Sequence, residues 1–217
     1  MNFKNLFTFL EDLNKNNDKE WMDDNRKRYH NIRDEYRKWL MTLDVELSEI
    51  DSDYYPTPKK KILNRINNNL LYHPNKPIYK DHFGAGLDKK PKTSDFYIHL
   101  GLSESFLAGG FYKPKSEFLK SIRDAIDYDG EVLKEILNKP SFKKTFGDLM
   151  EDDMLKTSPK GYSQEHQYID LLRHKSFAVM HTLNREEIYA DDFKTKIKKV
   201  YLEMLPFRRY LNKAVTV

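Results

Sequence analysis

The stretch from Asp95 to Tyr112 reads DFYIHLGLSESFLAGGFY. Its first half alternates apolar residues with others, so that Phe96, Ile98, Leu100 and Leu102 fall on one side and Tyr97, His99 and Gly101 on the other. This period of two is typical of a half-buried strand. Ser103, Glu104 and Ser105 have turn character, so the second half predicts the returning strand of an antiparallel hairpin. The Gly109-Gly110 pair predicts a bulge, or a place where something approaches the backbone closely.

Helices are predicted on the N-terminal side of this hairpin. Apolar residues at three and four spacing predict a helix over 2–13 that is capped by Asn2. Asn17 and Glu20 have the spacing of a capping box, which predicts the start of a long helix that continues to Ile50. The prolines at 56 and 58 close that region.

A strand and a long loop are predicted between these helices and the hairpin. Residues 61–66 (KILNRI) have strand character, and residues 67–92 are rich in Asn, Pro and Gly. Loops of this length are uncommon in compact domains, and they tend to be functional or mobile. The sequence therefore predicts a functional loop over 67–92.

The C-terminal side predicts mainly helices. They are expected from Pro114 to about Asp127, from Asp129 to before Pro140, within 141–150, over 164–174, and from about Asp191, with a kink or break at Pro206. Residues 155–162 are expected to form a loop and 176–183 a strand. Helices at both ends and a small antiparallel sheet between them predict the α+β class, in a single domain over residues 1–217.

The composition excludes several classes of protein. The chain has 217 residues, 38 Lys and Arg against 34 Asp and Glu, and a net charge of +4, which is a poor footprint for nucleic-acid binding. It contains no Cys, which excludes disulfides, thiolate metal sites and Cys nucleophiles. No apolar run is long enough to span a membrane and no signal peptide is visible, so a cytoplasmic protein without a membrane partner is expected.

The sequence predicts neither a metal site nor a cofactor. The seven His form no HxH, HxxxH or HExxH pattern, and the acidic run at 151–153 is expected to be a solvated loop. There is no GxSxG elbow, no phosphate-binding GxxxxGK[ST] loop and no GxGxxG after a strand.

Cations in the predicted loops are the main candidates for ligand binding. Arg65, Lys76 and Lys80 accompany Tyr79 in and before the long loop, and Lys156 and Lys160 flank a Thr-Ser pair in the later loop. A guanidinium fork with one or two ammonium groups binds phosphate or carboxylate well. The alternative is that these lysines are simply solvated. Arg65 has apolar neighbours, which predicts that it is partly buried and paired.

His99 is the candidate acid or base. It lies on the strand face opposite to the apolar residues. If that face is open to solvent, His99 is an ordinary exposed histidine. If the long loop covers that face, His99 meets Arg65, Tyr79 and Lys80 and can transfer protons.

Five stretches together resemble a bacterial family called domain of unknown function 2461. They are FLEDLNKNNDKEWMDDN, NRINNNLLYHPNKPIYKDHFGAGL, FYIHLGLSESFLAGGFYKP, LKSIRDAID, and LKTSPKGY followed by IDLLRHKSF, and they occur in the family's order from about Phe7 to Leu205. The resemblance implies one domain and a cytoplasmic setting, and it assigns no activity.

The family pattern near the long loop is close to R-I-x-R-D-x-R-F-S-x-D-K-x-P-Y-K. This chain matches it at Arg65, Ile66, Lys76, Tyr79 and Lys80, keeps an aromatic at Tyr72, and departs from it at Asn68, Asn69, Leu71, His73, Asn75 and Ile78. Two cations and two carboxylates of the pattern are absent. The obvious carboxylate base of the pattern is thereby removed. If the family has a reaction that needs this Asp, this member binds without catalysing.

Two hypotheses of function follow. The first is a ligand-binding domain, with or without enzymatic activity, that has a pocket beneath the 67–92 loop for an anionic or phosphorylated small molecule. Arg65, Lys76, Tyr79, Lys80, Gly109, Gly110, Lys156 and Lys160 are its candidate ligand-binding residues, with His99 as the acid or base. The alternative is a non-catalytic module that docks another protein through an aromatic-rich surface.

Overall fold

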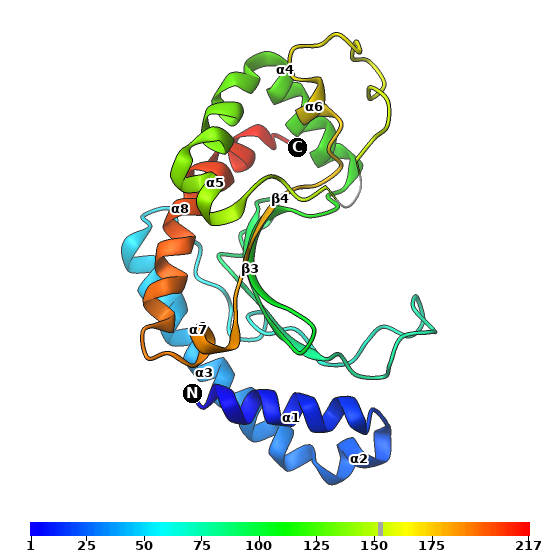
Figure 1. Ribbon diagram of the computed structural model, residues 1–217, viewed down its shortest axis with the longest axis vertical. Coiled ribbons are helices and arrows are strands. Elements are labelled where there is room, and N and C mark those ends of the chain that lie inside the picture. The colour runs from blue at the N-terminus through cyan, green and yellow to red at the C-terminus, as the bar shows by residue number, and fades with distance from the viewer. Residues whose placement is uncertain (152–153) are drawn as a thin grey trace. The chain divides into compact units, whose positions relative to one another are not determined.

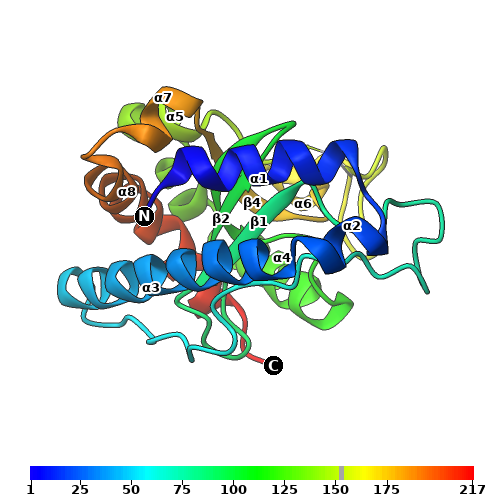
Figure 2. The same ribbon diagram turned by 90° about the horizontal axis from the view of Figure 1, so that it is seen from below.

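The structure is a computed structural model that describes residues 1–151 and 154–217. Its elements, labelled between Figures 1 and 2, are α1 (Phe3–Lys15), α2 (Lys19–Asp24), α3 (Arg26–Ile50), β1 (His82–Leu87), β2 (Asp95–Gly101), β3 (Ser105–Phe111), α4 (Ser116–Asn138), α5 (Pro140–Phe146), α6 (Ile169–Leu172), β4 (Phe177–Thr182), α7 (Arg185–Tyr189) and α8 (Phe193–Ala214). Helices at both ends and one four-stranded antiparallel sheet confirm the α+β class. The expectation for the acidic run at 151–153 falls largely outside the described residues.

The predicted hairpin is confirmed as β2 and β3, and it forms the middle of the sheet. The strand order is β1-β2-β3-β4. The amide of Leu102 donates to the Asp81 carbonyl, and that of Leu183 donates to the Ser105 carbonyl, so β1 and β4 both run antiparallel to their neighbours. The strand expected at 176–183 is β4, which is therefore also confirmed.

The largest error lies in the segment expected to be one long loop. Its second half contains β1, so the loop itself ends near Asp81. The segment expected to be a strand, 61–66, is not a regular strand. It pairs with β1 through a bridge between Leu63 and Ala85 and through a hydrogen bond from the Asn64 amide to the Gly84 carbonyl.

The helices confirm the general pattern but differ in their boundaries. Asn2 caps α1 as expected, because its side chain accepts a hydrogen bond from the Asn5 amide. The next cap is Asp18 rather than Asn17, and α2 and α3 replace one continuous helix. The expected helix at 164–174 shortens to the four residues of α6, and α8 continues through Pro206 without breaking.

The described residues form two compact units. Unit 1 comprises Met1–Asp88, Tyr97–Leu107 and Thr182–Lys196, and unit 2 comprises Lys89–Phe96, Ala108–His181 and Ile197–Val217. The single domain expected from the sequence stays a prediction. Among the described residues, no helix is long and apolar enough to cross a membrane.

Aromatic side chains build the core of unit 1. Figures 1 and 2 show α1 lying beside α3, and Phe9 of α1 stacks on Tyr29 of α3 with ring centroids 5.9 Å apart. Tyr29 in turn stacks on Phe83 of β1 at 6.3 Å, and Tyr36 meets the same ring edge-on. These contacts pack α1 and α3 on the sheet face that carries Phe83.

The core of unit 2 centres on α8. The ring of Tyr201 meets Phe96 edge-on at 5.2 Å, and Phe207 packs against Phe142 of α5. Arg208 is only 1% exposed, donates a hydrogen bond to the Ser94 carbonyl and lies over the Tyr201 ring. A buried cation is therefore part of this core.

Candidate functional site

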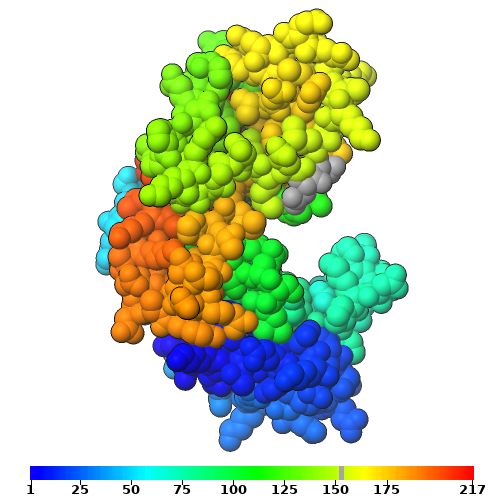
Figure 3. Space-filling view, viewed as in Figure 1, coloured from blue at the N-terminus to red at the C-terminus, as the bar shows by residue number. Residues whose placement is uncertain are grey.

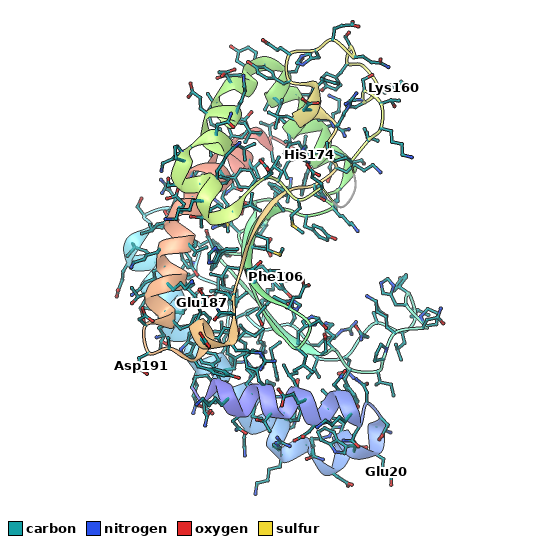
Figure 4. All side chains as sticks on the ribbon, viewed as in Figure 1. Glu20, Phe106, Lys160, His174, Glu187 and Asp191 are labelled. Carbon is teal, nitrogen blue, oxygen red and sulfur yellow. The ribbon has the colours of Figure 1, made fainter. Side chains whose placement is uncertain are left out.

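A row of rings lies on one face of the sheet in unit 1. His99 of β2 stacks on Phe106 of β3 with centroids 4.5 Å apart and planes 8° apart, and on His82 of β1 at 4.0 Å. Tyr97 adds its hydroxyl 3.4 Å from Nδ1 of His99. We call His82, Tyr97, His99 and Phe106 the ring cluster. Phe106 is labelled on its strand in Figure 4.

The alternation along β2 produces this face. Phe96, Ile98 and Leu100 are fully buried on one side of the strand, which leaves Tyr97 and His99 on the other. Two glycines allow the rings to lie flat against the sheet. A Cβ on Gly101 would lie 2.9 Å from both His82 Cβ and His99 Nε2, and a Cβ on Gly84 would collide with the Tyr97 hydroxyl.

Asp81 orients the His82 ring. Its Oδ1 lies 3.0 Å from Nδ1 of His82, and its Oδ2 accepts a 2.8 Å hydrogen bond from the Ser103 hydroxyl. Burial tends to raise the pKa of Asp81, but the hydrogen bonds from His82 and Ser103 outweigh it and lower this pKa overall. Asp81 is therefore an ionised acceptor, and Nδ1 of His82 is the nitrogen that donates to it.

His99 is a buried and neutral histidine. Its side chain is 9% exposed. Burial lowers its pKa to about 4, the His82 ring contributes in the same direction, and the Asp81 carboxylate opposes this effect. At neutral pH, His99 accordingly carries no charge and is a weak base.

Arg65, Lys76 and Lys80 form a second group in unit 1, which we call the cation cluster. Lys80 is partly buried and its ammonium donates a 2.8 Å hydrogen bond to the Arg65 carbonyl. Burial lowers the pKa of Lys80, and the charges of Arg65 and Lys76 lower it further. Across residues 1–151 and 154–217, no carboxylate forms an ion pair with any of the three.

Arg65 differs from its expectation, because it is exposed rather than partly buried and paired. Its neighbours Ile62 and Ile66 are buried, whereas Asn64 and Arg65 between them are exposed. Burial of these apolar neighbours therefore does not predict burial of Arg65 itself.

Tyr79 anchors the loop to the helices. It is 5% exposed, and the Asn17 side chain bonds its backbone on both sides, donating to its carbonyl at 3.0 Å and accepting from its amide at 2.9 Å. Asn17, expected as a helix cap, has this role instead. Tyr79 is therefore fixed at the base of the loop.

The loop between Asn67 and Pro77 has an exposed apolar tip. Leu71 is 83% exposed and Tyr72 is 74% exposed. Figure 3 shows this part of unit 1, in teal, standing out from its surroundings. No pattern in the sequence marks this tip.

The remaining candidates lie in unit 2. A Cβ on Gly109 would meet the Met204 side chain, and Gly110 has a φ of +117° and faces the backbone of Phe177 and Ala178. The expected close approach to these glycines is made by the chain itself. Lys156 and Lys160 are both exposed.

The structure thus brings together Arg65, Lys76 and Lys80, and it surrounds His99 with His82, Tyr97 and Phe106. Asp81, His82 and Ser103 were missed from the sequence. A strand prediction over 82–87 was the signal that could have found them, because it places His82 beside His99. No group of three His, Asp or Glu in the described part of the chain is arranged to hold a metal ion.

Comparison of the sequence with known protein families identifies one family. Residues 5–210 match the family described as conserved hypothetical protein DUF2461, so the chain belongs to that family. No curated protein matches the chain. No solved structure matches it either.

Proposed function

We propose that unit 1 binds an anionic small molecule, with phosphate as the preferred group, through the cation cluster. The observation that carries this proposal is that the partly buried Lys80 ammonium lies 2.8 Å from the Arg65 carbonyl, and the charges of Arg65 and Lys76 help to lower its pKa. Like charges held together without a carboxylate destabilise the free protein. A bound anion would relieve this repulsion.

The groups in the cluster suit a phosphate. Arg65 supplies a planar fork that can bind two oxygens, and the two lysines supply point charges. The Lys80 ammonium donates one hydrogen bond to the Arg65 carbonyl, which fixes its position beside Arg65. Two donors of that ammonium remain for a ligand.

The first experiment measures thermal stabilisation by inorganic phosphate, pyrophosphate and nucleoside phosphates. A ligand at 100 times its Kd adds about 2.7 kcal/mol to the unfolding free energy. Arg65→Ala and Lys80→Ala should each abolish most of this gain, whereas Lys60→Ala, which removes an exposed lysine of the same unit, should preserve it. Equal stabilisation of all three variants would refute the proposal.

A second candidate function is docking of another protein through the loop tip. The specific observation in its favour is the exposure of Leu71 and Tyr72, since apolar side chains that project together form anchors at interfaces. The double variant Leu71→Ser/Tyr72→Ser should lose a cross-linked partner that wild type retains. Tyr128→Ser is the matched control, because Tyr128 is 93% exposed on α4. A partner that both variants lose, or that both retain, would count against the tip.

A further inference from the structure

Among the described residues, two histidines are paired with an aspartate, and they differ at the second ring nitrogen. In unit 2, Nε2 of His166 lies 2.8 Å from Asp127, and Nδ1 accepts a 3.1 Å hydrogen bond from the Tyr168 amide. Both nitrogens of His166 are therefore engaged. In unit 1, Nδ1 of His82 is engaged by Asp81, and Nε2 has no hydrogen-bond partner among the described residues.

The surroundings of His82 fix the ring and leave its Nε2 accessible. Ser103 holds the second oxygen of Asp81, His99 covers one face of the imidazole at 4.0 Å, and Gly101 leaves the space in which both rings fit. The His82 side chain nevertheless remains 22% exposed. A ring that is held at Nδ1 and on one face and still reaches solvent has the geometry of a general base.

We propose that His82 is the proton-accepting residue of unit 1, that Asp81 is its positioning residue, and that the proton comes from a hydroxyl group or a bound water of the anionic ligand. The class of ligand rests on the proposed function, whereas the assignment of His82 does not. The Nε2 lone pair takes the proton, the Nδ1 proton stays on the ring and donates to Asp81, and the resulting imidazolium is stabilised by that carboxylate.

This assignment moves the acid or base role from His99 to its neighbour. His99 is buried and its Nδ1 meets only the Tyr97 hydroxyl at 3.4 Å, so among the described residues it has no hydrogen-bonded carboxylate to stabilise an imidazolium, and it has less access to solvent than His82. Its flat contacts with His82 and Phe106 instead make it a wall for the His82 ring.

The test uses diethyl pyrocarbonate, which acylates an unprotonated and accessible imidazole nitrogen, followed by mass spectrometry of each histidine peptide. In the wild-type protein at pH 7, His82 should be modified and His166 should not. Asp81→Asn should slow the reaction at His82 on the order of tenfold relative to the exposed His73 in the same sample, because without the carboxylate the proton is no longer held on Nδ1 and can occupy Nε2. Asp127→Asn, the matched control, should leave the rate at His82 unchanged.

Two further measurements make the result decisive. Long-range proton–nitrogen NMR of the wild-type protein should show the proton of His82 on Nδ1, and a proton on Nε2 would overturn the inference even if Asp81→Asn fails to fold. Pyrophosphate should protect His82 from acylation. If it neither protects nor stabilises the protein but the dependence on Asp81 holds, the anion assignment fails alone. If His82 reacts no faster in wild type than in Asp81→Asn, the role of His82 fails, whatever pyrophosphate does.

Discussion

At the scale of single residues, the candidate site shows which side chains a sequence can locate. His99 was placed on the correct face because strict alternation from Phe96 to Leu100 allows only one assignment. Its neighbour His82 begins a strand whose residues 84–86 are Gly-Ala-Gly, and these lack the β-branched or aromatic side chains that mark strands. The catalytic candidate was therefore hidden in an apparent loop.

The cations illustrate a second limit at the same scale. Arg65, Lys76 and Lys80 were identified from their residue types, but their convergence depends on pairing between the segment near Asn67 and that near Tyr79. No local pattern predicts such a pairing across the irregular chain that separates them. The structure was needed to separate this group from the many solvated lysines.

Gly110 provides a prediction that concerns one residue. Gly110→Ala should lower the unfolding free energy by more than Gly147→Ala does. Both glycines have positive φ angles, +117° and +72°, so both substitutions introduce backbone strain of about 1–3 kcal/mol. Only at Gly110 would the new methyl group also collide with backbone, with the Cα of Ala178 2.8 Å away, whereas nothing lies within 4 Å at Gly147.

Urea denaturation of the two variants checks this difference. A rigid collision adds to the strain, and we expect Gly110→Ala to be the less stable variant by about 2 kcal/mol. Equal losses would show that β3 and β4 shift apart at little cost. The Gly109-Gly110 pair would then have to be explained by something other than packing.

At the scale of elements, predictions succeeded where a period and a cap agreed. The segment 2–13 combines helical spacing with an Asn2 cap and forms α1. Asn17 and Glu20 have capping-box spacing, but the cap is Asp18, whose carboxylate accepts a hydrogen bond from the Trp21 amide at 2.8 Å. Neighbouring Asn and Asp residues cannot be ranked by type alone.

Tertiary contacts decided the elements that the sequence misplaced. The segment 164–174 has helical spacing, yet only Ile169–Leu172 are helical. The Tyr168 amide bonds the His166 ring, and Arg123 donates to the carbonyls of Leu172 and His174. The His166 ring thus takes an amide that a longer helix would have used, and Arg123 of α4 caps the carbonyl end of the segment, so these side chains override helix propensity in setting its bounds.

At the scale of the whole molecule, buried histidines link stability to pH. Burial lowers the pKa of His99 to about 4, and burial also lowers the pKa of His174, which is 7% exposed in unit 2. An unfolded histidine has a pKa of about 6.5. Between these values the unfolded chain binds more protons than the folded protein, so the unfolding free energy falls as the pH falls.

The contribution of these neutral histidines to the unfolding free energy should therefore be fully present above pH 6.5. It should be lost as the pH falls from 6.5 toward 4. His99 accounts for a loss on the order of 2 kcal/mol over this range. His99→Phe keeps a ring against Phe106 but cannot titrate, so the slope of unfolding free energy against pH should become shallower in this variant.

Urea denaturation at steps between pH 7 and pH 4.5 measures the slope, and His73→Gln, at an exposed position, is the control that should retain the slope of wild type. Because His82 and Asp81 face His99 and remain in both proteins, the difference between the two slopes isolates His99. Parallel slopes for wild type and His99→Phe would show that His99 is not held neutral in the folded protein, and the argument that moves proton transfer from His99 to His82 would lose its electrostatic support.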